Sequence, residues 1–433
     1  MERLTSAFGL CVLISLAWLM SSSRSSVSWR LVVSGVTLQF FLAAIILWTA
    51  PGRFVFESMG MFINVILGFV EDGAGFVLNL QQFPSDPPMP PRQALLRTFA
   101  FGVLPTVIFF SSLMSILYYL GIMQWVVIAM AKGMQKTLGT SGAESLAAAA
   151  NVFVGHTEAP LVVKPFISGM TLSEINALMV GGFATITGGL LAVFVGMGID
   201  AGHLLTASVI SAPAALVIAK VLQPETEVSE TSGCVEIRID EQSVNVIDAA
   251  AKGATEGMKL ALNIAAVLIA FIALLAMIDA LVGWAGMQLG FADEEGGPLW
   301  TLSRGLGYFF SPIALSMGIE WSECLHAGEL LGIKMVTNEV VAFEQLSVWL
   351  QSEDQPVSQR TASILTYALC GFSNFGAVGI QLGGIGSLAP NRRSDLAKLG
   401  VRAMLGGTIA CCMTVVLPAY YYPFETPNLF QST

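Results

Sequence analysis

The chain has 433 residues, of which 55% are hydrophobic and 12% charged, and its mean hydropathy is +0.72. Because a soluble protein carries roughly 25% charged residues, this composition excludes an ordinary soluble enzyme, a nucleic-acid-binding protein and a disordered chain. The formal net charge of −10 comes mostly from a few polar loops and says little about binding partners.

Eight segments are apolar over about the 20 residues that a helix needs to cross the hydrocarbon core of a bilayer. They are residues 4–20, 31–50, 98–123, 174–199, 204–222, 258–287, 361–388 and 405–422. The first segment could also be a cleaved signal peptide, but no convincing cleavage site follows it, so we interpret it as a retained helix. The sequence therefore predicts an all-α polytopic membrane protein with about eight transmembrane helices.

The stretches between these segments are predicted not to cross simply. Residues 54–70 are apolar but short and contain Glu57, which indicates an interfacial or partly buried helix. Residues 124–138 carry two lysines on an otherwise apolar helix, a pattern typical of a helix that lies on the membrane surface. A Pro-rich loop at 81–92 and a polar, acidic loop at 223–251 complete the set.

The distribution of lysine and arginine predicts the orientation, because cytoplasmic loops carry an excess of these residues. Three clusters can face the cytoplasm together if the N-terminus is outside and the two segments that do not cross simply, 141–166 and 302–343, each enter and leave on one side. They consist of Arg24 and Arg30; Lys132 and Lys136; and Arg392, Arg393, Lys398 and Arg402. Arg53, Arg92 and Arg97 fit this scheme less well, since it places them outside.

A carboxylate interrupts an apolar segment at residues 141–166. Glu158 would be costly at membrane depth unless it faced a cavity or a partner. Gly155 frees the backbone next to it, and Pro160 stops a helix from continuing through. The apolar flanks are each too short to cross, so the pattern predicts a re-entrant hairpin whose tip presents polar groups to a watery site. The alternative is a loop tip that is exposed at one surface.

The second half of the chain repeats this order of features. Glu339 lies in a second apolar frame, and the four residues from Gly182 (Gly-Phe-Ala-Thr) and from Gly371 (Gly-Phe-Ser-Asn) begin 24 and 32 residues after the two carboxylates. Asn374 ends the second motif. Its alternative role is a hydrogen bond that holds two helices together. Repeated broken segments are typical of secondary transporters with a site at the midplane. By the predicted orientation the two hairpins enter from opposite sides, which makes the repeat inverted.

Motifs for other functions are missing from the sequence. It contains no phosphate-binding Gly-x-x-x-x-Gly-Lys-Ser/Thr loop, so ATP-driven transport by this chain is not supported. Neither His-Glu-x-x-His nor Gly-x-Ser-x-Gly occurs, which gives no support to an intramembrane hydrolase. The six cysteines have no metal-ligand spacing, and three histidines are too few for a histidine metal site. A channel and a membrane-embedded enzyme remain as alternatives to a carrier.

Four motifs taken together resemble the concentrative nucleoside transporters. They are Gly-His-Thr-Glu-Ala-Pro-Leu at 155–161, Asn-Glu-Val at 338–340, Cys-Gly-Phe-Ser-Asn at 370–374 and Gly-Gly-Ile-Gly-Ser-Leu-Ala-Pro at 383–390. The resemblance is strongest over residues 98–415. It implies eight transmembrane helices, two oppositely oriented re-entrant hairpins and a homotrimer. It also implies cation-coupled nucleoside uptake, for example of uridine, by an elevator-like movement, and no enzymatic activity.

The resemblance also implies a role for individual residues in substrate binding. His156, Thr157 and Glu158 are expected at the base, Glu339 and Asn374 at the ribose hydroxyls, and Phe372 along the same pocket. The family often has Gln in place of His156, Ser in place of Ala377 and a smaller apolar residue in place of Leu190. These differences leave the preferred base open, and a carrier of another polar metabolite, such as a nucleobase, is the alternative.

Sodium is the coupling ion that the resemblance favours. The matching ligands are the Asn151 side chain, the Thr185 hydroxyl and the backbone carbonyls of Val154 and Ile186. These neutral oxygens suit a hard cation. In the alternative, the ion is a proton taken up by Glu158 or His156, and Asn151 caps the hairpin.

The predicted organisation has five parts. They are N-terminal scaffold helices with the Pro-rich loop (1–123), the surface helix with the first hairpin and repeat (124–222), the acidic loop (223–252), a connecting transmembrane helix (253–300) and the second hairpin and repeat (301–433). With eight crossings, the chain is expected to be a multi-pass protein of a bacterial inner membrane.

Overall fold

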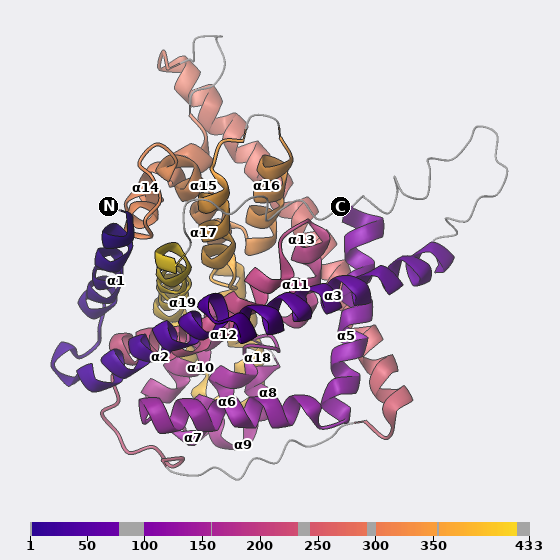
Figure 1. Cartoon of the computed structure of the whole chain (residues 1–433). Coiled ribbons are helices and arrows are strands. Elements are labelled where there is room, and N and C mark those ends of the chain that lie inside the picture. The colour runs from indigo at the N-terminus through magenta and orange to yellow at the C-terminus, as the bar shows by residue number, and fades with distance from the viewer. Residues whose placement is uncertain are drawn as a thin grey trace.

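The fold comes from a computed structural model, which describes residues 2–77, 99–156, 158–232, 243–291, 300–352 and 355–421. Within these residues the regular structure is helical (Figure 1). The predicted Pro-rich loop at 81–92 lies outside the described residues. The N-terminal part consists of α1 (Glu2–Leu19), η1 (Arg24–Ser26), α2 (Trp29–Trp48), α3 (Ala50–Val77), η2 (Phe99–Val103), α5 (Leu104–Tyr119) and α6 (Ile122–Leu138).

Two groups of broken helices follow, separated by one long helix. The first group comprises α7 (Gly142–Ala150), α8 (Ala159–Val162), α9 (Lys164–Ile167), α10 (Leu172–Ala184), α11 (Gly188–Gly196) and α12 (Ala201–Leu222). Helix α13 (Val246–Gln288) connects it to the second group. That group comprises α14 (Leu302–Ser316), α15 (Cys324–Val336), α16 (Glu339–Gln351), α17 (Gln359–Leu369), α18 (Phe375–Leu388), η3 (Pro390–Arg392) and α19 (Arg393–Tyr421).

Seven helical segments within the described residues are long and apolar enough to cross a membrane. Six of them coincide with predicted crossings. The seventh is α3, whose 28 residues make it longer than the predicted interfacial helix, because it continues past Glu71 and Asp72 to Val77. The other two predicted crossings correspond to α1 and to the broken pair α17–α18, whose apolar helices are shorter. Helix α13 begins at Val246, inside the stretch 223–251 that the sequence predicts as a loop.

The predicted surface helix is present as α6. Its buried residues are Met123, Val127, Ala131, Met134 and Leu138. Their spacing of three to four residues places them on one face of the helix, whereas Lys132 and Lys136 are exposed. The helix is therefore amphipathic, as its sequence predicts.

The broken segment α10–α11 and the continuous helices α12 and α19 form the centre of the molecule. The most apolar windows of α10–α11, α12 and α19 are 83%, 89% and 83% buried, against 18% for α13 and 22% for η2–α5. Small residues allow the central helices to approach closely. A Cβ at Gly407 would lie 2.4 Å from that of Phe183, and one at Gly371 would lie 2.8 Å from the Phe183 carbonyl oxygen.

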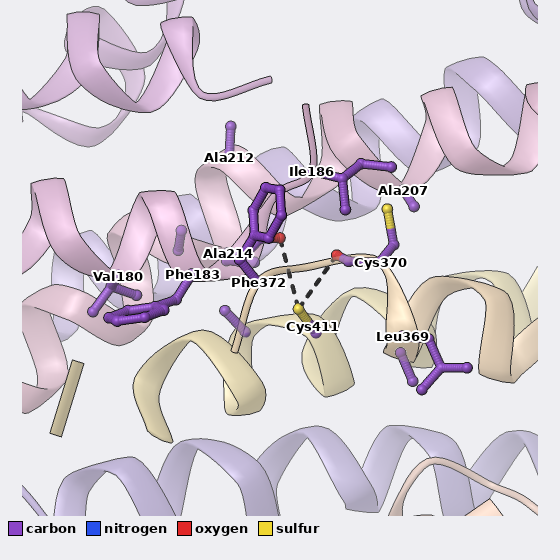
Figure 2. Close-up of a cluster of buried hydrophobic side chains, with 14 of the residues drawn as sticks. Val180, Phe183, Ile186, Ala207, Ala212, Ala214, Leu369, Cys370, Phe372 and Cys411 are labelled. Atoms are coloured by element: carbon purple, nitrogen blue, oxygen red, sulfur yellow. Dashed lines mark hydrogen bonds between the residues drawn. The ribbon is translucent and has the colours of Figure 1, made fainter. Parts of the chain in front are cut away.

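The two helix breaks meet at one point in this centre. Helix α10 stops before Thr185 and α17 stops before Cys370. The Cys411 thiol of α19 donates to the carbonyls of both Ala184 (3.6 Å) and Cys370 (3.5 Å), as Figure 2 shows. The Ser373 hydroxyl donates to the Phe183 carbonyl (2.9 Å) and joins the breaks a second time.

The outer ends of the two hairpins lie at opposite ends of the bundle (Figure 1). The first hairpin consists of α7–α9. The Gly142 N–H at the start of α7 donates to the Thr231 carbonyl in the loop after α12 (2.9 Å), and Ser168, which follows α9, donates to Asn391 of η3 (3.3 Å). Two of the predicted cytoplasmic clusters adjoin the end of α12: Ser22, two residues before Arg24, donates from its N–H to the Leu222 carbonyl (2.9 Å), and Arg402 donates to the Gln223 side chain (3.4 Å). At the other end, Glu323 before α15 accepts hydrogen bonds from Ser358 before α17. Entry into a bilayer from opposite sides stays a prediction.

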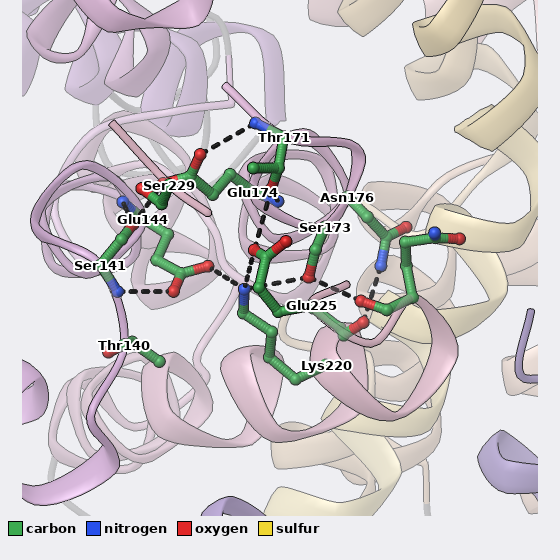
Figure 3. A network of polar contacts seen from close by, with 12 residues as sticks. Thr140, Ser141, Glu144, Thr171, Ser173, Glu174, Asn176, Lys220, Glu225 and Ser229 are labelled. Atoms are coloured by element: carbon green, nitrogen blue, oxygen red, sulfur yellow. Dashed lines mark hydrogen bonds and ion pairs between the residues drawn. The ribbon is translucent and has the colours of Figure 1, made fainter. Parts of the chain in front are cut away.

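A buried polar cluster fastens the outer end of the first hairpin (Figure 3). Ser141–Glu144 and Thr171–Glu174 form the capping boxes that begin α7 and α10. The Lys220 ammonium of α12 lies 2.7 Å from Glu144 and 3.2 Å from Glu225. A buried charge is stable only when it is paired and hydrogen-bonded in this way. The cluster therefore ties α7, α10 and α12 together at one end.

Candidate functional site

The first hairpin turns back at a short non-helical tip. Helix α7 ends at Ala150 and α8 begins at Ala159, with Pro160 in its first turn, where the missing N–H breaks no helical bond. The Glu158 carboxylate is exposed at this tip and accepts from the Gly155 N–H at 3.4 Å. With arms of at most nine residues, or about 14 Å at 1.5 Å per residue, the hairpin is too short to span the core of a bilayer.

The second hairpin, which consists of α15 and α16, presents a carboxylate that already has a hydrogen-bond partner. Asn338 caps α16 by accepting from Val341 N (3.0 Å), which places Glu339 in the first helical turn. Asn374 caps α18 in the same way, through Ala377 N (2.8 Å). The Asn374 amide donates to Glu339 Oε2 at 3.0 Å. Two helix N-termini are therefore joined by their polar side chains, both 5% exposed or less.

A cavity of about 830 Å³ lies where the two hairpins and the broken helices meet. His156, Glu158, Glu339, Phe372 and Asn374 all line it, so the structure brings these predicted substrate residues together. Thr157, the remaining one, lies outside the described residues. Leu190 and Ala377, which differ from the family pattern, face the same space.

His156 is buried beside the cavity. Its side chain is 7% exposed, and neither ring nitrogen has a hydrogen-bond partner among the described residues. The imidazole meets the Phe372 ring edge-on, with ring centroids 4.5 Å apart. Buried polar groups normally have partners, so these nitrogens are available to a bound molecule.

Asn151 and Thr185, two of the four predicted ion ligands, lie beside the same residue, Gly181. Asn151 is 1% exposed, and neither its amide oxygen nor its nitrogen has a partner among the described residues. A Cβ on Gly181 would lie 2.9 Å from that amide nitrogen, and the Thr185 hydroxyl donates to the Gly181 carbonyl at 2.9 Å. Gly188 N donates to Phe153 O at 3.1 Å, which joins the hairpin tip to the break after α10.

The donor set suits a hard monovalent cation. Within the described residues the carbonyls of Val154 and Ile186 accept no hydrogen bond, because each lies in a turn outside the helices. With Asn151 and Thr185 they supply neutral oxygens, and the described residues contain no group of three or more His, Cys, Asp or Glu side chains that could hold a metal. Sodium at such sites is held by unwound backbone carbonyls, so the residues fit this ion.

The cavity also has a wall that the sequence did not reveal. Tyr118 of α5 and Glu256, Lys259 and Asn263 of α13 line it from the peripheral helices. Glu256 and Glu158 both line the cavity, so the two carboxylates face the same space. Asn263 is a lone amide within the longest apolar segment. It was the one sign in the sequence that this helix faces a polar space.

Comparison with known proteins places the chain in a family. Residues 203–418 match the family model described as "Na+ dependent nucleoside transporter C-terminus", residues 8–80 the corresponding N-terminus and residues 100–201 a "Nucleoside recognition" domain. An "Uncharacterized transporter" of Haemophilus influenzae is 41% identical over 97% of this chain and 98% of its own length. The chain belongs to the Na⁺-dependent nucleoside transporter family.

Other members of the Na⁺-dependent nucleoside transporter family are similar over nearly the whole chain. "Solute carrier family 28 member 3" of Eptatretus stoutii is 41% identical over 98% of this chain, and "Sodium/nucleoside cotransporter 1" of Mus musculus 40% over 97%. The chain spans only 62% and 64% of the length of these vertebrate relatives.

Solved structures agree with the fold. CNTnw in an inward-facing substrate-bound state is 38% identical to this chain, with a TM-score of 0.87 over 97% of this chain and 98% of that one. A CNTnw variant in an outward-facing state gives a TM-score of 0.88 over the same shares. The all-helical membrane fold predicted from the sequence is thereby confirmed.

Proposed function

We propose that this protein takes up nucleosides across the membrane by coupling their entry to that of Na⁺. The observation that carries the proposal is the cavity between the hairpins, where His156, Glu158, Glu339 and Asn374 converge beside the ion ligands. The relatives named as sodium/nucleoside cotransporters support both the ion and the substrate class.

The substrate is proposed from the polarity of the cavity. A nucleoside is neutral and carries ribose hydroxyls and base N–H groups that donate hydrogen bonds. Glu339 and Asn374, which already contact each other, would hold the ribose hydroxyls, and charge-assisted bonds of this kind are the strong ones. His156, Thr157 and Glu158 would contact the base, and Phe372 would pack against it. An analogue without the hydroxyls would leave buried groups unpaired and be rejected strongly.

The ion is proposed from Asn151, Thr185 and the carbonyls of Val154 and Ile186. The Asn151 side chain has no protein partner to cap or link within the described residues. This observation favours an ion ligand over a structural amide. Proton coupling through Glu158 or His156 is the competing mechanism.

The movement is proposed to be elevator-like. The parts at 1–123 and 253–300 would form the scaffold, and those at 124–222 and 301–433 would carry the two hairpins, with the loop at 223–252 between them. The buried centre formed by α10, α12 and α19, set against the more exposed α5 and α13, supports this division. The hairpins would be re-entrant from opposite faces. Assembly as a homotrimer and location in a bacterial inner membrane belong to the same proposal.

Uptake of labelled uridine into proteoliposomes tests the function. We expect accumulation above equilibrium with external Na⁺ and loss of accumulation when Na⁺ is replaced by potassium or choline at fixed pH. Uptake that survives Na⁺ removal but collapses with a protonophore would show proton coupling. Equilibration without accumulation would indicate a channel, and conversion of uridine an enzyme. Competition by a nucleobase but not by uridine would indicate a nucleobase carrier.

A further inference from the structure

Gln381 is a buried amide close to the cavity that the proposed binding site does not use. It lies on α18, is 0% exposed and is not among the residues that line the cavity. Its Nε2 donates to the Met179 carbonyl of α10 at 3.2 Å. Since a backbone carbonyl only accepts, this contact fixes the nitrogen end of the amide. The Oε1 atom is therefore the other end of the amide, and it can only accept.

Gly182 of α10 brings Gln381 and His156 together. A Cβ added to Gly182 would lie 2.7 Å from the His156 Cβ and 2.8 Å from the Gln381 Nε2, so both side chains border the same small space. Only one carbon atom separates the His156 Nδ1 from that Cβ, and one carbon separates the Gln381 Oε1 from that Nε2. Rotation of the His156 side chain can bring Nδ1 to Oε1, and one buried water can bridge a remaining gap.

Both side chains have unsatisfied polar atoms. The Gln381 Oε1 is buried without a hydrogen-bond partner among the described residues, and so are both ring nitrogens of His156. An unpaired buried polar atom is costly, and such atoms in native proteins nearly always have a partner. An acceptor and an imidazole that border the same space are therefore suited to pair with each other.

An acceptor beside the imidazole decides where its proton lies. In a neutral histidine one ring nitrogen carries the proton and the other accepts, and the partner of one nitrogen sets the role of the other. Because the Gln381 Oε1 can only accept, it selects the form of His156 with the proton on Nδ1. Nε2 is then left as an acceptor for a molecule in the cavity that His156 lines.

We propose that Gln381 is a positioning residue, which holds His156 in the Nδ1–H form so that Nε2 accepts from an N–H group of the base. The pocket then prefers nucleosides whose base carries such a donor, for example the N3–H of uridine. This proposal deepens the proposed function and rests on it for the identity of the ligand. The position of the proton can be measured without transport.

Nitrogen NMR of the purified protein tests the position of the proton. The chain has three histidines, so ¹⁵N-labelled histidine gives few signals, and those of His156 are identified by their loss in His156→Gln. Protonated and unprotonated ring nitrogens differ clearly in chemical shift. We expect Nδ1 to carry the proton in the parent and both forms to appear in Gln381→Met. A proton on Nε2 in the parent would overturn the proposal.

Competition by uridine and by 3-methyluridine, which lacks the N3–H group, tests the consequence for the base. We expect the parent to prefer uridine and Gln381→Met to reduce this preference by roughly two- to tenfold, the range of one neutral hydrogen bond. In a His156→Gln background the same substitution should change the preference by less than about twofold, because Gln381 would have no imidazole to orient.

Gln39→Met is the matched control for the loss of a buried amide. Gln39 of α2 is 1% exposed and donates to the Ile210 carbonyl at 3.2 Å, the same distance as between Gln381 and Met179. It is not among the residues that line the cavity. Gln39→Met therefore removes a similar bond between helices and should leave the preference for uridine unchanged.

The outcomes are distinct. A loss of preference in Gln381→Met that disappears in the His156→Gln background supports the positioning role. An unchanged preference, or an equal loss in both backgrounds, would overturn it, because Gln381 would then not act through His156. If Gln381→Met cannot be purified, the position of the proton in the parent decides. Failure of the parent to bind uridine would count against the proposed function but would not affect the NMR result.

Discussion

The tips of the two hairpins differ in how their polar groups are satisfied. At the first, Asn151 and His156 are buried with no partner for any side-chain nitrogen or oxygen among the described residues. At the second, Asn338 caps a helix, and Glu339 is paired with Asn374. An unpartnered buried polar group is costly, so the first tip needs a ligand to be complete. The second tip is already formed before any ligand arrives.

The contrast predicts that the second tip supplies affinity and the first supplies ion dependence and base selectivity. Preorganised groups bind without the cost of ordering them, and orphaned groups gain most from a ligand. Substitutions at the two tips should therefore have different effects on nucleoside affinity, sodium dependence and base preference.

Glu339→Gln should have the largest effect on substrate. It keeps the size of the side chain but removes the charge that strengthens the ribose bonds. We expect a loss of about 1.5–3 kcal/mol in nucleoside binding, which is roughly ten- to a hundredfold in affinity. Uridine binding to purified protein measures it, with Glu344→Gln on the same helix as control. If both Glu339→Gln and Glu158→Gln proteins insert normally and transport uridine like the parent, the substrate site lies elsewhere.

Asn151→Ala should act on the ion. The variant removes one oxygen ligand from the proposed Na⁺ site without breaking a protein hydrogen bond, since the amide has none among the described residues. We expect about a tenfold rise in the Na⁺ concentration for half-maximal uptake, in line with the loss of one bond to a charged group. Folding should be preserved in detergent. Altered folding with unchanged Na⁺ dependence would instead identify Asn151 as a structural cap.

His156→Gln should have the smallest effect and the most selective one. Both side chains can donate and accept, but at different positions along the base edge. We expect the ranking of purine and pyrimidine nucleosides to change by roughly two- to tenfold, the range of a single neutral hydrogen bond. A competition panel measured at several pH values checks it. An unchanged ranking and an unchanged pH profile would mean that His156 only packs against Phe372.

Local patterns in the sequence predicted most of the helices and both hairpin motifs. Hydropathy locates the crossing helices because a bilayer requires apolar residues over the whole length of such a helix. Hydropathy did not find the parts of helices that contain charged residues. These are the end of α3, from Glu71 onward, and the start of α13, before Ala251. Helical backbone bonds tolerate such residues, so hydropathy alone misplaces the ends of these helices.

The site was predicted only in part, for a different reason. His156, Glu158, Glu339 and Asn374 occur in short motifs, and motifs can be matched without a structure. Tyr118 and Glu256 line the cavity only because α5 and α13 pack beside the first hairpin. Asn263 marks α13 as a helix with a polar neighbour, but no pattern in either helix specifies which elements it packs against, so the wall formed by α5 and α13 could not be derived from the sequence.

The shared contacts of the two helix breaks bear on how ion and substrate influence each other. The break after α10 borders the proposed Na⁺ ligands, and the break after α17 carries Phe372 and Asn374. Cys411 and Ser373 connect the two directly. If Na⁺ alters the first break in a way that strengthens nucleoside binding at the second, thermodynamic reciprocity requires the nucleoside to strengthen Na⁺ binding by the same factor. Each occupant would thus delay the release of the other, and a carrier loaded with only one of them would lose it more readily.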